Sequence, residues 1–262
     1  MRNILITVSY DGTYFCGWQR QDKSDGGKPV RTVQGEIEKV LETIHKVKTP
    51  LQGSGRTDSG VHAVRQAANF FSPVDSIPAK KYVPALNSLL PSDIRILDAK
   101  EVDEKFSSRF SATSRSYRYF IIPSHKALAS QMPYAWDIGH EPDIDKLNEM
   151  ASCLKGEIDC ATFAASGDES LSTFRFINDA YFFYQDLYPW GKALVFEITA
   201  NAFLWKMVRS IVGSLIFFEK DKDVSYFKEV LESHDRSKAG PTAPPQGLFL
   251  WDVSFEGERK HI

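Results

Sequence analysis

The chain has 262 residues, of which 42% are hydrophobic and 25% charged, and its formal net charge is -2. This length is ample for a hydrophobic core and fits one large or two modest domains. Its three cysteines, Cys16, Cys153 and Cys160, are odd in number and lack CxxC spacing, which argues against a disulfide framework and a zinc ribbon.

The same pattern indicates a cytoplasmic protein with reduced thiols. The N-terminal residues resemble a first strand rather than a signal peptide, because the apolar run is short and soon turns polar. The long apolar stretch at residues 202–218 contains Lys206 and Arg209, so it falls short of a membrane span. We therefore expect no association with a membrane.

The first half of the chain has the periodicity of a strand, a helix, two strands, a helix and a strand. Thr32 can cap the first helix, and the glycines and charges from Asp22 to Pro29 are typical of an exposed loop. The expected elements are a strand at residues 4–10, a helix after Thr32, strands at 50–53 and 64–71, a helix at 82–90 and a strand at 94–102.

The second half repeats this order with one extra helix. The expected elements are a strand at residues 115–122, a helix at 144–154, strands at 174–184 and 193–200, a helix at 202–218, a shorter helix at 226–231 and a last strand at 248–255.

Each half therefore matches the split βαβ motif used by RNA-recognition domains among many others. We expect an α+β fold of two ferredoxin-like, RRM-like (βαββαβ) subdomains with antiparallel sheets flanking a central cleft. The boundary is expected near Asp103, which gives subdomains at residues 1–102 and 103–262. This topology hosts many unrelated activities, so function depends on particular residues.

The densest chemical signal is GSGRTDSGVHA at residues 53–63. Its three glycines favour a tight, exposed turn around Arg56 and Asp58, and it is neither a P-loop nor a dinucleotide fingerprint. An arginine two residues from an aspartate can hold the carboxylate ionised and oriented, as a nucleophile or base requires. The alternative is an Asx turn in which Asp58 caps backbone amides. His62 has no second His or Cys nearby, so a structural role fits it better than metal binding.

Arg209 lies within an otherwise apolar helix, where an unpaired charge is costly to bury. Its partner is either a structural carboxylate or, in a functional role, Asp58 or a phosphate group.

The segment at residues 105–118 carries four basic and no acidic residues. Its Arg109 and Arg115 are candidate substrate contacts, and the alternative is a solvated charged face. On a strand Tyr117 and Tyr119 share one face, where a tyrosine beside arginines can stack on an extruded base. Core packing is the alternative for both tyrosines, and we prefer it for Tyr119.

The sequence GRTDSGVHA at residues 55–63 resembles the catalytic motif of the TruA-type tRNA pseudouridine synthases. Seven further segments resemble family segments, in family order and over nearly the whole chain: YDGTYFCGWQRQ, RTVQGEIEKVL, NSLLPSDI, FSSRFSATSRSYRYF, TFRFI, ANAFLWKMVRSIVGSL and APPQGLFL. The resemblance implies two α/β subdomains around a cleft, a homodimer, and action on uridines 38, 39 and 40 of the tRNA anticodon arm. It implies no metal, redox cofactor or ATP.

The resemblance also implies roles for individual residues. Asp58 matches the catalytic aspartate, Arg56 the arginine of the same motif, and Arg209 an arginine that pairs with the aspartate. Tyr117 matches the tyrosine that packs on the target base, and Leu248 an apolar residue that lines the pocket. Two departures are that Cys160 stands where the family usually has Phe, and that the loop from Asp22 to Pro29 is longer than usual.

Two other functions compete with this one. A non-catalytic RNA-binding protein would explain the basic segment and the RRM-like halves, but not the joint presence of Arg56, Asp58, Tyr117 and Arg209. An unrelated metabolic enzyme on a duplicated ferredoxin-like fold is disfavoured by the missing cofactor motifs.

Overall fold

The computed structural model describes residues 1–21, 30–187 and 191–260, so the loop expected from Asp22 to Pro29 lies outside the described residues. The chain divides into two compact units. The first unit comprises Met1–Thr113 and Phe249–Glu256, and the second comprises Ser114–Leu248 and Gly257–Ile262. The subdomains expected at residues 1–102 and 103–262 stay a prediction.

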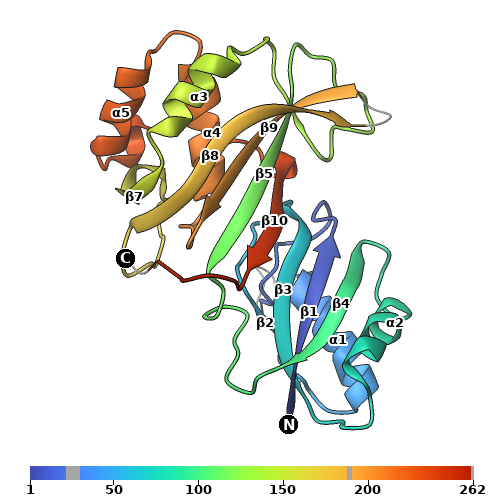
Figure 1. Ribbon diagram of the computed structural model, residues 1–262. Coiled ribbons are helices and arrows are strands. Elements are labelled where there is room, and N and C mark those ends of the chain that lie inside the picture. Colours follow the sequence, from blue (N-terminus) through green and yellow to red (C-terminus); the bar gives the residue numbers. More distant parts are fainter. Residues whose placement is uncertain (22–29, 188–190, 261–262) are drawn as a thin grey trace. The chain divides into compact units, whose positions relative to one another are not determined.

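The first unit has the expected βαββαβ order (Figure 1). Its elements are β1 (Arg2–Tyr10), α1 (Val33–His45), β2 (Gln52–Gly53), β3 (His62–Ser72), η1 (Ala79–Lys81), α2 (Tyr82–Asn87) and β4 (Ile94–Val102). The strand order is β4-β1-β3-β2, and all three pairings are antiparallel. The predicted α+β class is therefore confirmed.

The last strand of the chain, β10 (Leu248–Ser254), pairs in parallel with β3, where Phe249 lies opposite His62 and Leu250 opposite Ala63. From the sequence we expected this strand as the last element of the second subdomain, at residues 103–262. In the structure, residues 249–256 belong to the first unit. A partner strand nearly 190 residues away leaves no signal in local periodicity.

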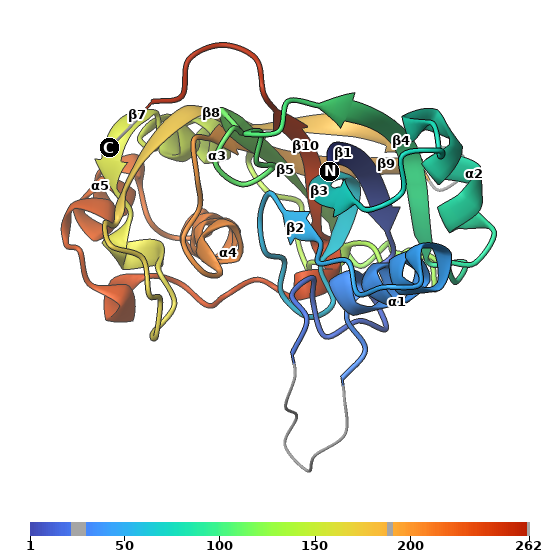
Figure 2. The same ribbon diagram turned by 90° about the horizontal axis from the view of Figure 1, so that it is seen from below.

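The core of the first unit follows from the two periodicities. The side chains of Ile4, Ile6 and Val8 point to one face of β1, and Ile37 and Leu41 lie one turn apart on α1; all five are fully buried. Thr32 caps α1 by accepting the Gly35 N–H. Figure 2 shows α1 against one face of these strands.

The second unit is built on an antiparallel sheet of order β5-β9-β8-β7, with β6 parallel to β5. Its elements are β5 (Ser114–Ile122), β6 (Trp136–Asp137), α3 (Ile144–Ser152), β7 (Gly156–Asp159), η2 (Ala161–Phe163), β8 (Phe174–Leu187), β9 (Gly191–Ala200), α4 (Met207–Phe218), α5 (Val224–Glu232), η3 (Arg236–Lys238) and η4 (Pro245–Gly247). Helix α3 packs on β8 and contacts α4 and α5. The short strands β6 and β7 were not expected from the sequence.

The expected helix at residues 202–218 was wrong at its beginning, because α4 begins only at Met207. Lys206 has a left-handed backbone, with φ of 58°, which a helix does not accommodate. The preceding residue is held elsewhere: the Trp205 N–H donates to the Asp168 carboxylate, and the Trp205 carbonyl accepts the Ala165 N–H at 3.0 Å. Tertiary hydrogen bonds therefore override the helical pattern of residues 202–206.

No helix among the described residues is long and apolar enough to cross a membrane. Cys16, Cys153 and Cys160 are all free thiols. Cys160 is fully buried, and burial raises the pKa of its thiol to about 12, so at neutral pH it is an uncharged packing residue.

Candidate active site

Asp58 lies on the connection between β2 and β3 of the first unit. Its carbonyl accepts the Val61 N–H at 3.2 Å, which closes a tight turn that Gly60 completes with φ of 77°. The residue is half-buried, and Arg56, two residues before it on the same connection, is exposed. We call residues 54–61 the Asp58 turn; its tight bend lies at residues 58–61, and Arg56 precedes that bend.

A buried glutamine holds the base of this turn. Gln66 is fully buried on β3, and its Oε1 accepts from the Ser54 hydroxyl at 2.7 Å and from the Ala67 N–H at 3.1 Å. Its Nε2 donates to the Gly55 carbonyl at 2.8 Å. One side-chain amide therefore fixes the residues that lead into Arg56 and Asp58.

The segment at residues 10–18 packs against the same turn. The Tyr10 hydroxyl lies 2.8 Å from the Thr57 hydroxyl, and the Trp18 N–H donates to the Thr57 carbonyl at 3.1 Å. The Ser59 hydroxyl donates to the Phe15 carbonyl at 3.2 Å. These bonds are made by the two neighbours of Asp58 in the sequence, Thr57 and Ser59. The segment at residues 10–18 therefore holds the turn in place.

Two glycines of that segment permit this close approach. A Cβ added to Gly12 would lie 2.0 Å from the Val61 carbonyl oxygen. Gly17 has φ of 84°, and a Cβ there would lie 2.5 Å from the Thr57 carbonyl oxygen. Both positions therefore require a residue without a side chain.

His62, at the end of the turn, joins three segments of the first unit. Its Nδ1 accepts the Gly12 N–H at 3.0 Å and lies 3.2 Å from Asp11 Oδ1. Its ring stacks on Phe249 of β10, with centroids 4.5 Å apart and an interplanar angle of 18°. The side chain is 1% exposed. Among the described residues no group of three or more His, Cys, Asp or Glu could hold a metal ion, and the contacts of His62 are those of a structural residue.

Replacing Gln66 with leucine is expected to lower the free energy of unfolding by about 3 kcal/mol, because the Ser54 hydroxyl, the Gly55 carbonyl and the Ala67 N–H would each lose the hydrogen bond that the Gln66 side chain makes. Urea denaturation measures the change. The matched control is Gln52→Leu on β2, whose side chain is exposed, and a change within about 0.5 kcal/mol is expected there. Equal losses of stability in both variants would contradict a specific role for the Gln66 amide.

In the second unit, Arg115, Tyr117 and Tyr119 alternate along β5 and so point to the same face of the sheet. Arg115 and Tyr117 meet the segment that leads into α4. Arg115 is buried and donates from Nη1 to the Asn201 carbonyl at 2.9 Å, and Tyr117 packs edge-on against Phe203 with centroids 4.9 Å apart.

Tyr119 is a core residue, as preferred from the sequence. Its hydroxyl donates to the Pro244 carbonyl at 2.7 Å, and the side chain is fully buried. Burial raises the pKa of Tyr119 well above its usual value, and the positive charge of Arg209 acts in the opposite direction. Tyr119 therefore stays neutral and holds the 240–247 segment in place.

Arg209 is half-buried on α4 and is fixed by the same segment. Its Nε donates to the Ala243 carbonyl at 2.8 Å, and the Ala243 N–H donates back to the Arg209 carbonyl at 3.0 Å. The backbones of α4 and this segment approach closely at Gly213, because glycine has no Cβ. A Cβ there would lie 1.8 Å from the Pro241 carbonyl oxygen. The segment then leads to Leu248, which is 5% exposed at the start of β10.

The basic segment at residues 105–118 does not act as one surface. Arg109 is exposed, with its guanidinium 5.3 Å from the centre of the Phe110 ring, whereas Arg115 is buried. Arg118 points to the other face of β5 and forms an ion pair with Glu197 of β9. The charge pattern of residues 105–118 could not predict this ion pair, because Glu197 lies on β9, far from Arg118 in the sequence.

The candidate residues are divided between the two units. Arg56, Asp58 and Arg109 belong to the first unit, and Arg115, Tyr117, Arg209 and Leu248 belong to the second. Sequence reasoning missed the buried residues that fix them, namely Tyr10, Thr57, Gln66 and Asn201. The glycines of YDGTYFCGW were the one local signal for such a close approach.

Comparisons with known proteins point in one direction. A family model described as tRNA pseudouridine synthase matches residues 6–111 and 150–256. The tRNA pseudouridine synthase A of Treponema denticola is 56% identical over 258 residues, which cover 97% of this chain and 93% of that protein. The protein of the same name from Treponema pallidum is 50% identical over 92% of this chain and 84% of its own length. The one from Caldicellulosiruptor saccharolyticus is 40% identical over 97% of this chain and 100% of its own.

Proposed function

The chain belongs to the tRNA pseudouridine synthase family, and from this premise we propose that it isomerises uridines 38, 39 and 40 in the anticodon stem-loop of tRNAs to pseudouridine. Asp58 is the proposed catalytic carboxylate. The observation that carries the proposal is the Asp58 turn, which presents a half-buried carboxylate on backbone held by hydrogen bonds on both sides.

The reaction breaks the bond between uridine N1 and C1′, turns the detached uracil, and joins its C5 to C1′. C5 loses its proton to solvent and N1 takes up a proton, so the product is an isomer of uridine. Attack on the sugar, attack on the ring and deprotonation at C1′ all require one ionised carboxylate at the reacting nucleotide. They also require an enclosed position that retains the free base. The Asp58 turn meets the first of these requirements, because hydrogen bonds hold the carboxylate in position before the substrate binds.

Arg56 and Arg209 are the proposed catalytic cations. Arg56 is exposed two residues from Asp58 and can orient the carboxylate or contact a phosphate. Arg209 has its Nε committed to the Ala243 carbonyl, so the direction of its guanidinium is set by the backbone of residues 240–247. A guanidinium with a fixed direction suits the proposed role of Arg209, which is to pair with the Asp58 carboxylate or with a phosphate group of the substrate.

We assign substrate contacts to Tyr117, Leu248, Arg109 and Arg115. Tyr117 is proposed to pack on the target base and Leu248 to line the uracil pocket. Arg109 is exposed and fits a phosphate contact. Arg115 is buried and bonded to the Asn201 carbonyl, so its proposed contribution is a positive charge held at the segment that leads into α4.

Replacing Tyr117 with leucine is expected to slow the single-turnover rate by about ten- to a hundredfold, which is the range expected when an aromatic ring that stacks on a base is removed. Tyr117→Phe keeps the ring and its edge-on packing against Phe203, so its rate is expected to stay within about threefold of the wild-type rate. Rapid-quench measurement with excess enzyme checks both variants. A phenylalanine variant as slow as the leucine variant would show that the hydroxyl, rather than the ring, is what matters.

We also propose that the protein is a homodimer and that it works in the cytoplasm, where its tRNA substrates are. Analytical ultracentrifugation at micromolar concentration tests the dimer. A single species of 29.6 kDa over the whole concentration range would overturn it.

The function itself is tested by tritium release from tRNA transcripts labelled at uridine C5, because pseudouridine formation expels the C5 hydrogen. Release is expected, with modification mapping to positions 38, 39 and 40. Tight tRNA binding without release would favour a non-catalytic RNA-binding protein. Absence of tRNA binding at low salt, where phosphate contacts dominate affinity, would favour an unrelated enzyme.

A further inference from the structure

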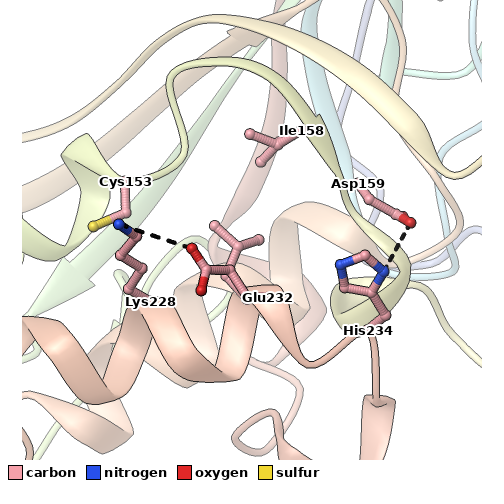
Figure 3. Close-up of a pocket in the computed structure, with 7 residues that line it drawn as sticks. Cys153, Ile158, Asp159, Lys228, Glu232 and His234 are labelled. Atoms are coloured by element: carbon pink, nitrogen blue, oxygen red, sulfur yellow. Dashed lines mark ion pairs between the residues drawn. The ribbon is translucent and has the colours of Figure 1, made fainter.

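Two cavities of the second unit differ in the charges that line them. One, of about 400 Å³, lies between α5 and β7 (Figure 3). Its two acidic residues each have a basic neighbour, since Lys228 lies 3.8 Å from Glu232 and His234 Nδ1 lies 3.1 Å from Asp159 Oδ2. This cavity therefore has no cluster of charges of one sign that would select a ligand.

The other cavity, of about 270 Å³, is lined by three cationic side chains, Arg175, Arg259 and Lys260. Its lining contains no carboxylate among the described residues. The remaining lining residues include two exposed apolar side chains, Leu171 and Phe174, and four polar or small residues: Ser170, Ser172, Asn201 and Ala202.

Arg175 is positioned to meet an anion. Its Nη1 donates to the Ser172 carbonyl at 2.8 Å, but its Nε is buried and has no hydrogen-bond partner in the described part of the chain. Burial lowers the pKa of Arg175, and the positive charge of Arg259 acts in the same direction. The nearby Asp168 opposes this shift, but its oxygens already accept the N–H groups of Ser170 and Trp205. Close cations that destabilise one another in this way favour a bound anion.

The cavity has a built frame. Asn201 is 7% exposed, and its side-chain amide donates to the Lys260 carbonyl at 2.8 Å and accepts the Phe176 N–H at 3.1 Å. The Asn201 carbonyl accepts from Nη1 of the buried Arg115 at 2.9 Å, so the backbone and the side chain of Asn201 are both held by hydrogen bonds. Figure 1 shows the coloured part of the C-terminal segment near the beginning of β8, in agreement with the bonds that join Asn201 to Lys260 and to Phe176. The Asn201 side chain therefore ties the backbone at Lys260 to the beginning of β8, and the Ser172 carbonyl holds the Arg175 guanidinium.

The two apolar lining residues indicate what kind of anion fits. Leu171 is fully exposed and Phe174 is 43% exposed, so exposed apolar side chains share the cavity with the cations. Cations beside an exposed aromatic ring are the arrangement with which proteins hold single-stranded nucleic acid, where the cations meet phosphates and the ring meets a base. Free inorganic phosphate has no apolar or aromatic part that could contact Leu171 or Phe174.

We propose that the cavity formed by Arg175, Arg259, Lys260 and the serines at residues 170 and 172 binds a phosphate group of the RNA backbone, with a neighbouring base against Phe174. The inference rests on the proposed function only in taking tRNA as the ligand. Arg175 and Arg259 donate to the phosphate oxygens, and Lys260 adds charge at the exposed side.

The test is tRNA affinity as a function of salt for the double variant Arg259→Gln, Lys260→Gln. We expect the Kd for wild-type tRNA to rise about tenfold at moderate salt. The slope of log Kd against log salt should fall by about one unit for each phosphate that the variant no longer neutralises. The single-turnover rate at saturating tRNA should stay unchanged, because neither residue is placed in the catalytic machinery. The double variant Lys220→Gln, Lys238→Gln removes two exposed charges of the same unit outside the cavity and should leave affinity and slope as in the wild type.

Thermal unfolding of each variant, together with the exposed single variant Lys260→Gln, separates weaker phosphate binding from unfolding of the protein. An unchanged salt slope in a folded double variant would overturn the inference. If tRNA binding is unchanged but phosphorus NMR shows that inorganic phosphate no longer binds, the cavity holds a free anion and not RNA, which also overturns it. Lack of tritium release by the wild type would reject the proposed reaction, whereas a change in tRNA affinity at this cavity would still stand.

Discussion

Asp58→Asn is expected to abolish pseudouridine formation, with a single-turnover rate at least about a thousandfold below that of the wild type. Asparagine has the same shape but neither the charge nor the nucleophilic oxygen of a carboxylate. The fold should remain intact, because the turn is closed by the Asp58 carbonyl and the Val61 N–H, which the substitution does not touch. Tritium release from C5-labelled tRNA measures the fall in rate.

Two controls make this result specific. The tRNA Kd of Asp58→Asn should stay within about threefold of the wild-type value, since phosphate contacts rather than one carboxylate supply most of the affinity. The variant Asp98→Asn removes an exposed carboxylate of β4 in the same unit, paired at 3.3 Å with Lys80, and should release tritium at the wild-type rate. An Asp58→Asn enzyme that keeps its rate would refute the assignment of Asp58.

Gly17→Ala is expected to impair both stability and catalysis. The backbone at this position has φ of 84°, which costs an alanine about 1–2 kcal/mol. Its Cβ would also lie 2.5 Å from the Thr57 carbonyl oxygen and 3.2 Å from the Asp58 carbonyl carbon, so one of the two segments must move. A total decrease of about 3 kcal/mol in the free energy of unfolding is expected. Displacing the turn by about 1 Å should slow the reaction on the order of a hundredfold.

Gly55→Ala is the matched control within the Asp58 turn. A Cβ on Gly55 would have no heavy atom within 4 Å, and its backbone is not left-handed. We expect a change in the free energy of unfolding within about 0.5 kcal/mol and an unchanged rate. Urea denaturation and single-turnover kinetics measure both variants. If Gly17→Ala behaves like Gly55→Ala, the packing of residues 10–18 does not position Asp58.

Local patterns predicted most of the elements. The strand at residues 94–102 has the predicted bounds, and α1 begins directly after its predicted cap, Thr32. Both succeed because alternation and capping depend on neighbours in sequence. The start of α4 failed because hydrogen bonds to Asp168 and Ala165, more than thirty residues away, determine the backbone of Trp205.

The candidate site shows the same division. Asp58 and Arg56 could be chosen from the sequence because their motif is continuous and rich in glycine. The residues that hold the turn, such as Tyr10 and Gln66, have no local feature that marks them as support. Nor did local charge predict that Arg115 would be buried on the Asn201 carbonyl while Arg109 is exposed.

By itself, the sequence determined the α+β class, the order of the elements, the family and the residues proposed for catalysis. These follow from periodicity, turn chemistry and continuous motifs, which depend on interactions between near neighbours. Only the tertiary structure decided that β10 pairs with β3, that residues 10–18 support the Asp58 turn, and that Arg175, Arg259 and Lys260 share one cavity. The physical reason is that each of these interactions joins segments far apart in the chain, so its energy depends on the packed fold and leaves no local pattern.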